Sequence, residues 1–113
     1  MRYSPAFALL AAVLFCGLCI QPVLAESAYE WVNSGNQLNQ QGRYKEALQA
    51  YENAINLTSR NKYAWSGKSN VLNLMGRSAE ALSAAEKALA IDSGNAEFWN
   101  SKGIALKSID RLP

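Results

Sequence analysis

The sequence has 113 residues, with 11 Lys and Arg, 9 Asp and Glu, 2 Cys and no His, and its formal net charge is +2. This length fits one domain. The near-neutral charge gives no basic field for a phosphate backbone, so it excludes an electrostatic nucleic-acid interface. Without His there is no imidazole base and no imidazole metal ligand, and we expect neither a metal site nor a cofactor.

The N-terminal segment, residues 1–25, has the layout of a secretory signal peptide. Arg2 is its only charge, and residues 6–20 form a near-unbroken apolar run. Val23 and Ala25 supply the modest side chains that a signal peptidase site has at its −3 and −1 positions. The apolar run is shorter than the ~20 residues of a transmembrane helix. We therefore predict an export signal at this end of the chain.

Two outcomes for this segment remain open. Residues 1–25 are predicted to be a cleaved signal peptide, which makes the protein secreted or extracytoplasmic. The alternative is an uncleaved membrane anchor over residues 5–24.

Cys16 and Cys19 form a CxxC inside the apolar run, but no second CxxC or His accompanies it, so we interpret them as small apolar residues of the leader.

The rest of the sequence is an internal repeat. Trp31, Trp65 and Trp99 are evenly spaced, with a step of 34 in the numbering. The same step relates Leu38, Leu72 and Leu106, then Gly42 and Gly76, then Asn61 and Asn95, and finally Arg43-x-x-Glu46-Ala47-Leu48 and Arg77-x-x-Glu80-Ala81-Leu82. Self-similarity at such a period is typical of arrays of stacked supersecondary units.

Each unit is predicted to form two helices. In the first unit, apolar and small residues recur every three or four positions over 31–38 and again over 44–55, with Gly42 between the two stretches. The second unit repeats this pattern over 65–72 and 81–89. No stretch alternates with period two, so we predict no strands.

Small residues fall on the inward faces of these helices, where they permit close helix approach. They are Gly35, Ala47, Ala54, Ala81 and Ala88. The three tryptophans are interpreted as large side chains that fill the core between them. Glu46, Glu52, Glu80 and Glu86 recur with the repeat beside basic residues, so we interpret them as exposed helix charges and not as catalytic carboxylates.

These residues resemble the tetratricopeptide (TPR) repeat, a 34-residue helix–turn–helix unit. The resemblance is carried by Trp31-x3-Gly35-x2-Leu38-x3-Gly42-x-Tyr44-x2-Ala47-x3-Tyr51-x2-Ala54 and covers about residues 28–113. The second unit follows the pattern less fully. There Ser69, Ser78 and Ala85 replace Gly, Tyr and Tyr, from which we expect looser packing.

The resemblance implies an all-α fold in which antiparallel helix pairs stack as an α-solenoid behind an N-terminal apolar signal helix. We expect repeat 1 over residues 28–61, repeat 2 over 62–95, and the first helix of a truncated repeat 3 over 96–113. Leu112-Pro113 is typical of a helix start, which favours truncation over a minimal array closed by a lone helix. The apolar surface that a missing helix would cover is expected at Phe98, Ile104, Ile109 and Leu112.

In the family, the first helix of each pair lines a concave face that binds peptides or partner proteins. Carried onto this chain, the candidate peptide-binding residues are Tyr29, Asn33, Asn36, Asn39, Tyr63, Asn70, Asn73 and Asn100. The same helices also present Val32, Gln40, Ser66, Leu74, Glu97, Ile104 and Lys107. An amide offers both donors and acceptors, so a row of Asn side chains suits an extended peptide backbone. Val32 stands where TPR domains that grip chaperone tails have a Lys, so that specificity is not expected.

The predicted function is therefore a non-enzymatic scaffold for a protein or peptide, with no catalytic residues. The alternative is an N-terminal fragment of a larger TPR protein whose missing C-terminal part carries an enzymatic or sensory activity. A third interpretation is self-association through the open C-terminal end. Asn56-Leu57-Thr58 is a glycosylation sequon, which matters only in a host that glycosylates exported proteins.

Overall fold

The computed structural model describes residues 20–111, with side chains from residue 28 onward, and the regular secondary structure in this part of the chain is helical throughout. The helices are α2 (Ile20–Gln40), α3 (Tyr44–Leu57), α4 (Lys62–Leu74), α5 (Ser78–Ile91) and α6 (Ala96–Asp110). The all-α prediction is confirmed. Most of the predicted signal helix, residues 1–19, lies outside the described residues. Between residues 20 and 111, no helix has the length and apolar character needed to cross a bilayer.

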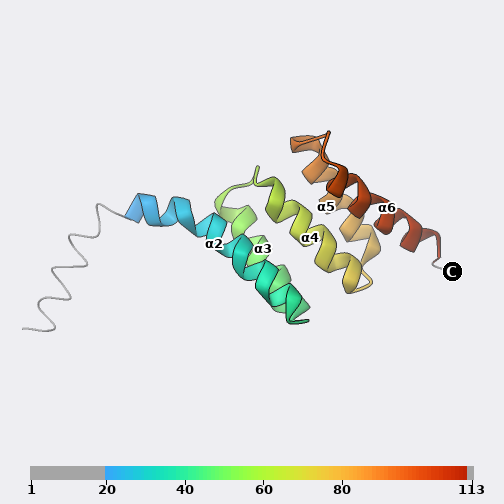
Figure 1. Ribbon diagram of the computed structural model, residues 1–113, viewed down its shortest axis with the longest axis horizontal. Helices are drawn as coiled ribbons and strands as arrows, with labels where there is room; N and C mark the ends of the chain where they lie inside the picture. Colours follow the sequence, from blue (N-terminus) through green and yellow to red (C-terminus); the bar gives the residue numbers. More distant parts are fainter. Residues whose placement is uncertain (1–19, 112–113) are drawn as a thin grey trace, which may run out of the picture.

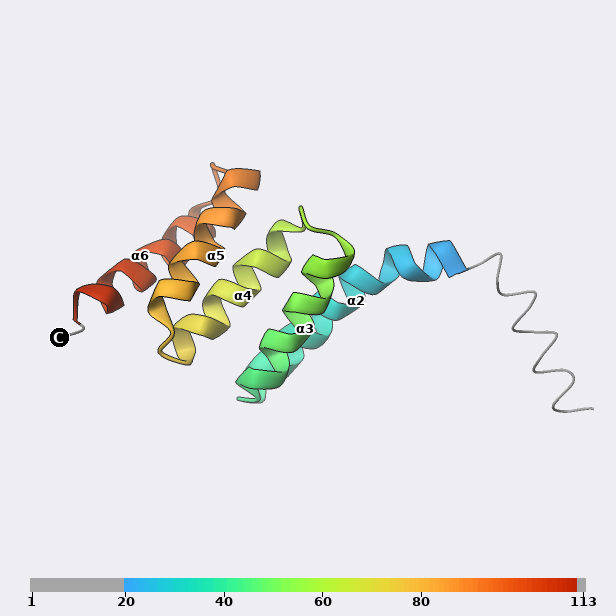
Figure 2. The same ribbon diagram turned by 180° about the vertical axis from the view of Figure 1, so that it is seen from behind.

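The helices form a stack of antiparallel pairs. α2 packs on α3 and α4 packs on α5, while α3 also contacts α4 and α5 contacts α6. The first helices α2, α4 and α6 lie on the near side in Figure 1, and α3 and α5 lie on the near side in Figure 2. The starts of α3 and α5, at Tyr44 and Ser78, are one repeat apart, and so are the starts of α4 and α6. The helix bounds therefore follow the period of the sequence.

A glycine closes the first helix of each complete pair. Gly42 and Gly76 both have φ of +78°, a left-handed conformation that costs other residues energy. One residue later, the backbone N–H of Arg43 donates to the carbonyl of Leu38 at 2.9 Å. Arg77 donates in the same way to Leu72 at 2.9 Å. This is the hydrogen-bond pattern of a glycine-terminated helix, and it reverses the chain within three residues.

Between α2, α3 and α4, small residues surround one large side chain. The four alanines expected on inward faces are fully buried, as predicted. Tyr51 of α3 is 1% exposed, and its ring lies between Gly35 of α2 and Gly67 of α4. A Cβ atom at Gly35 would lie 2.7 Å from Cε1 of Tyr51, and one at Gly67 would lie closer still. Three helices therefore meet around this ring because two of them lack a side chain there.

The second helix pair, α4 and α5, has different side chains at the positions of Gly35 and Tyr51. Ala85 stands one repeat after Tyr51, and Ser69 one repeat after Gly35. Both residues are fully buried. The Ser69 hydroxyl donates to the backbone carbonyl of Ala81 at 2.8 Å, which satisfies the buried polar group. Both positions are therefore sealed from water, with a serine in place of the glycine and an alanine in place of the tyrosine.

The interpretation of all three tryptophans as core residues is wrong. Trp31 is 38% exposed and Trp99 is 52% exposed, and only Trp65 packs against a buried cluster. The indole N–H of Trp65 donates to the carbonyl of Ser59, and that of Trp99 to Ser93, both at 2.8 Å. Both carbonyls belong to surface connectors. An indole that must reach them keeps one edge in water.

Lysine side chains cover part of these indole rings. The ammonium of Lys68 lies 5.4 Å from the ring centroid of Trp65, and that of Lys102 lies 5.3 Å from Trp99. The same lysines cross to the preceding second helix, where Lys68 pairs with Glu52 at 3.4 Å and Lys102 with Glu86 at 3.7 Å. Trp65 and Trp99 therefore make matching contacts with a connector carbonyl and a lysine one repeat apart, although only Trp65 also packs against a buried cluster.

The remaining glutamates of the repeat pair within their own helices. Arg43 binds Glu46, and Arg77 binds Glu80, three residues apart in each case. Each guanidinium lowers the pKa of its glutamate, chiefly through the side-chain hydrogen bond. All four side chains are exposed, so these are solvated helix charges, as the sequence indicated.

The surface expected at the end of the array is only partly present. Ile104 is 46% exposed, Ile109 is half-buried, and Leu112 lies outside the described residues. Phe98 was expected at this surface and is instead fully buried. It packs with Ala88 and Leu89 of α5. Its backbone N–H donates to the side chain of Asn95, which caps the start of α6.

Candidate functional site

The first helices enclose two adjoining hollows. One has a volume of about 180 Å³ and is lined by Tyr29, Val32, Asn33, Asn36, Asn61 and Tyr63. The other has a volume of about 210 Å³ and is lined by Val32, Asn36, Asn39, Tyr51, Tyr63, Ser66, Gly67, Asn70 and Glu97. Because three residues line both, we treat them as one continuous site and call it the first-helix groove.

Six of the eight predicted site residues line this groove: Tyr29, Asn33, Asn36, Asn39, Tyr63 and Asn70. The other two do not. Asn73 donates from Nδ2 to the backbone carbonyl of Ser101 at 3.3 Å, which ties α4 to α6. Asn100 is exposed on α6 and lines neither hollow. Asn73 therefore contributes to the packing of α4 on α6, and Asn100 lies on the exposed surface of α6.

The sequence prediction missed Asn61, Tyr51 and Gly67 as groove residues. Asn61 lies in a connector, and its repetition as Asn95 was the available signal. Tyr51 comes from α3, a second helix, and reaches the groove only because Gly67 leaves room for its ring. Nothing in a first-helix pattern indicates that a second-helix ring extends this far.

The hydroxyl of Tyr51 fixes the first of two central amides. It donates to Oδ1 of Asn36 at 2.5 Å. Asn36 lines both hollows, and its Nδ2 donates to no acceptor among the described residues. In this arrangement the oxygen of Asn36 is engaged and its Nδ2 remains available as a donor.

A different hydroxyl fixes the second amide. Ala85 replaces Tyr51 in the second repeat and is too short to reach Asn70. Ser101 of α6, one repeat after Gly67, donates from Oγ to Oδ1 of Asn70 at 2.6 Å. The Nδ2 of Asn70 likewise has no acceptor in residues 28–111. The two repeats thus reach the same amide orientation with donors from different helices.

Burial raises the pKa of Tyr51 to about 12. The folded protein holds this proton more tightly than the unfolded chain, whose tyrosines titrate near 10.0. The contribution of Tyr51 to stability is therefore complete below pH 10.0 and is lost as the pH rises toward 12.

This difference predicts a late step in an alkaline titration. Phenolate absorbance in the near ultraviolet should show a step for Tyr51 between pH 10.0 and about 12, together with the loss of helical circular dichroism. Tyr51→Phe should remove that step, and Tyr63→Phe should leave it in place. A single step near pH 10.0 with the helices intact would contradict the burial of Tyr51.

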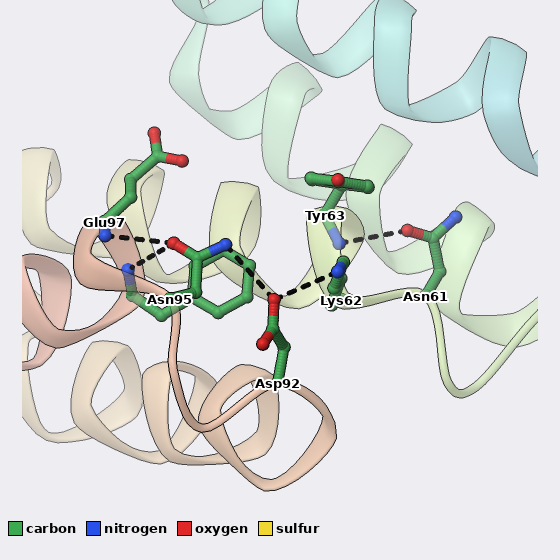
Figure 3. Close-up of polar contacts among 7 residues, drawn as sticks. Asn61, Lys62, Tyr63, Asp92, Asn95 and Glu97 are labelled. Carbon is green, nitrogen blue, oxygen red and sulfur yellow. Dashed lines mark hydrogen bonds and ion pairs between the residues drawn. The ribbon is translucent and has the colours of Figure 1, made fainter.

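Polar contacts at the helix starts hold the rim of the groove (Figure 3). Asn61 accepts from the N–H groups of Tyr63 and Ala64 at 3.1 Å, which caps α4. Asn95 caps α6 in the same way, accepting from the N–H of Glu97 at 3.0 Å. Each cap fixes where its helix begins and so where the first side chains of that helix lie.

An ion pair ties these two caps together. Lys62 lies 3.0 Å from Oδ2 of Asp92, which also accepts from Asn95 at 3.4 Å. The hydrogen bond from Lys62, and then that from Asn95, lowers the pKa of Asp92. In Figure 3 the side chains of Tyr63 and Glu97 project to the same side of this network. Two groove residues from neighbouring repeats are thus held on one rim.

The groove contains no positive side chain among the described residues. Its lining consists of Asn, Tyr and Ser residues with one Val and one Gly, and Glu97 is its single charged member. The part of the chain that the structure describes holds no cluster of His, Cys, Asp or Glu able to bind a metal ion. The arrangement therefore offers amide and hydroxyl hydrogen bonding, aromatic area and one negative charge.

Comparison with known proteins finds a similar repeat and a similar fold. Residues 35–76 match a family model described as TPR repeat. No curated protein matches the sequence significantly. Three similar solved structures are the first TPR domain of the human RPAP3 protein, the Arabidopsis OM64 TPR domain, and the first TPR of Spaghetti (RPAP3) bound to the HSP90 peptide SRMEEVD.

The likeness to these structures extends over most of this chain. The human RPAP3 domain is 20% identical with a TM-score of 0.73, and the match covers 76% of this chain and 68% of that one. The OM64 domain is 21% identical with a TM-score of 0.74, covering 76% and 71%. The Spaghetti domain is 20% identical with a TM-score of 0.74, covering 76% and 68%. This likeness shows that the chain has the fold of a TPR domain, and the match to the TPR repeat model extends over residues 35–76.

Proposed function

We propose that this protein is a non-enzymatic scaffold that binds an extended peptide segment of a partner protein in the first-helix groove. The observation that carries the proposal is the pair of amides at Asn36 and Asn70. They lie one repeat apart in the same hollow, and each has its oxygen engaged and its Nδ2 without an acceptor among residues 28–111. An extended backbone presents hydrogen-bonding groups at regular intervals, which suits a ladder of fixed amides.

Two tyrosines supply contact area beside these amides. Tyr29 is 69% exposed and Tyr63 is 58% exposed, and both line the first hollow with Val32 and Asn33. A tyrosine has few rotatable bonds, so it gains contact area at a small cost in conformational entropy. We propose that these rings pack on the side chains of the peptide while the amides hold its backbone.

A peptide ligand also fits the comparisons. One solved TPR domain with this fold is bound to the HSP90 peptide SRMEEVD. The present groove differs from a site for an acidic tail. Val32, at the position where the resemblance would require a Lys, is apolar and 7% exposed. We therefore propose a peptide ligand for this chain, but not the HSP90 peptide.

The proposal predicts a strong effect of the two amides on binding. A peptide selected on the wild-type protein from a random dodecapeptide phage library serves as the probe. The double change Asn36→Ala and Asn70→Ala should weaken its affinity more than about tenfold, since each hydrogen bond is worth about 1 kcal/mol. Isothermal titration calorimetry measures the affinity, and thermal melting checks that the fold is kept.

Asn53→Ala provides the matched control, because Asn53 lies on α3 and lines neither hollow. It should leave the affinity unchanged. If the selection yields no peptide, or if the double variant binds its peptide as tightly as the wild type, the groove is not a peptide site.

We further propose that the chain is exported from the cytoplasm. The support is the sequence of residues 1–25, with its single charge, its apolar run and its small residues before Glu26. The N-terminal residue of the protein recovered outside the cytoplasm tests this. Glu26 at that position identifies a cleaved signal peptide, whereas Met1 identifies a membrane anchor.

A further inference from the structure

We infer that the first-helix groove selects a positively charged peptide segment, with its backbone carbonyls on Asn36 and Asn70 and a cationic side chain beside Glu97. This inference rests on the proposed peptide-binding function. It adds that the ligand is positively charged and that its backbone accepts hydrogen bonds from the two amides. It combines two features of the groove: the free Nδ2 groups of its two central amides, and the negative sign of the one charged side chain among its described lining residues.

The amides offer hydrogen to the ligand. The oxygen of Asn36 is engaged by the Tyr51 hydroxyl at 2.5 Å, and that of Asn70 by the Ser101 hydroxyl at 2.6 Å. With both oxygens engaged in this way, neither Nδ2 has an acceptor among residues 28–111. Both Nδ2 groups are therefore available as donors, and the groups of a peptide backbone that accept from them are carbonyl oxygens.

The charge of the groove has one sign. Lys62, which precedes the groove residue Tyr63, is already paired with Asp92. No Lys or Arg is among the described residues lining either hollow. A carboxylate on a bound peptide would therefore lose water without meeting a cation, which disfavours acidic segments.

Glu97 supplies the opposite preference. Its carboxylate lines the second hollow together with Asn36 and Asn70, and it forms no ion pair within residues 28–111. The cap at Asn95 fixes the first turn of α6 and hence the place of this side chain at the rim (Figure 3). A Lys or Arg of the peptide that follows the two amides along the groove reaches this carboxylate.

The test is the charge of the peptides that the protein selects. The random dodecapeptide library is selected in parallel on the wild-type protein, on Glu97→Gln and on Glu30→Gln. Glu30 is an exposed carboxylate of α2 outside both hollows, so its variant changes the net charge equally without touching the groove. We expect Lys and Arg to be enriched on the wild type and on Glu30→Gln, and the enrichment to disappear on Glu97→Gln.

Affinities then locate the contact. In the best wild-type peptide, replacing the enriched Lys or Arg by Gln should weaken binding about two- to five-fold, the range of an exposed ion pair. The same replacement should have no effect on the Glu97→Gln protein, because the two changes remove the same interaction. The wild-type protein should bind the acidic peptide SRMEEVD more weakly than any selected peptide.

The outcomes separate this inference from the proposed function. Selected peptides rich in Asp and Glu, or without charge preference, would overturn the inference while leaving peptide binding intact. An enrichment of Lys and Arg that persists on Glu97→Gln would overturn the role of Glu97. The absence of any selected peptide would overturn the proposed function, and the inference would fall with it.

Discussion

Phe98→Ala should lower the free energy of unfolding by about 3–5 kcal/mol, the usual cost of truncating a buried aromatic side chain. Phe98 is fully buried and packs with Ala88, Leu89 and Trp65, so it joins α6 to the second repeat. Its removal leaves a cavity at a junction that few other large side chains fill. Urea denaturation followed by circular dichroism measures the loss.

The neighbouring residue provides the control. Trp99 is a larger side chain in the same turn of α6, but it is 52% exposed. Trp99→Ala removes the hydrogen bond to Ser93 and a partly exposed ring, and should cost about 0.5–1.5 kcal/mol. Hydrogen exchange of residues 96–110 should quicken strongly in the first variant and weakly in the second. Equal losses in the two variants would contradict the assignment of Phe98 to the core.

This pair also shows how far the sequence alone can be interpreted. The regular repeat spacing, the glycine turns and the inward alanines predicted the helices and their order, because each depends on local backbone chemistry or on spacing along one helix. The assignment of Trp99 to the core and of Phe98 to the surface was wrong. The indole N–H binds a connector carbonyl six residues earlier in the chain, a contact that helix periodicity does not encode.

For the candidate site, the sequence predicted most of the lining residues but not how their side chains are held. Six of eight residues lie in the groove because first helices share one face of the stack. The orientation of Asn36 and Asn70 was not predictable. It depends on hydroxyls from Tyr51 and Ser101, which are 15 and 31 residues away in the sequence. The first repeat uses the Tyr51 hydroxyl of α3 and the second uses the Ser101 hydroxyl of α6. Because these donors are not one repeat apart, the repeat spacing does not reveal them.

Gly67→Ala should lower the free energy of unfolding by about 1–3 kcal/mol, the cost of overpacking a filled core. A Cβ at this position would overlap the ring of Tyr51, which is 1% exposed. The ring has no free direction of escape, because moving away from Gly67 brings it toward Gly35 on the opposite side. The helix-propensity gain of about 1 kcal/mol from Gly to Ala offsets only part of this strain.

Gly103→Ala isolates that propensity gain. Gly103 lies within α6, and a Cβ there would meet nothing within 4 Å. This variant should be more stable than the wild type by about 0.5–1 kcal/mol. The opposite signs of the two Gly→Ala changes in thermal melting are the expected result. In a Tyr51→Ala background the clash is removed, so Gly67→Ala should then stabilise as Gly103→Ala does. If it still destabilised that background, close packing on Tyr51 would not be the reason for a glycine at position 67, and the meeting of three helices around this ring would need another explanation.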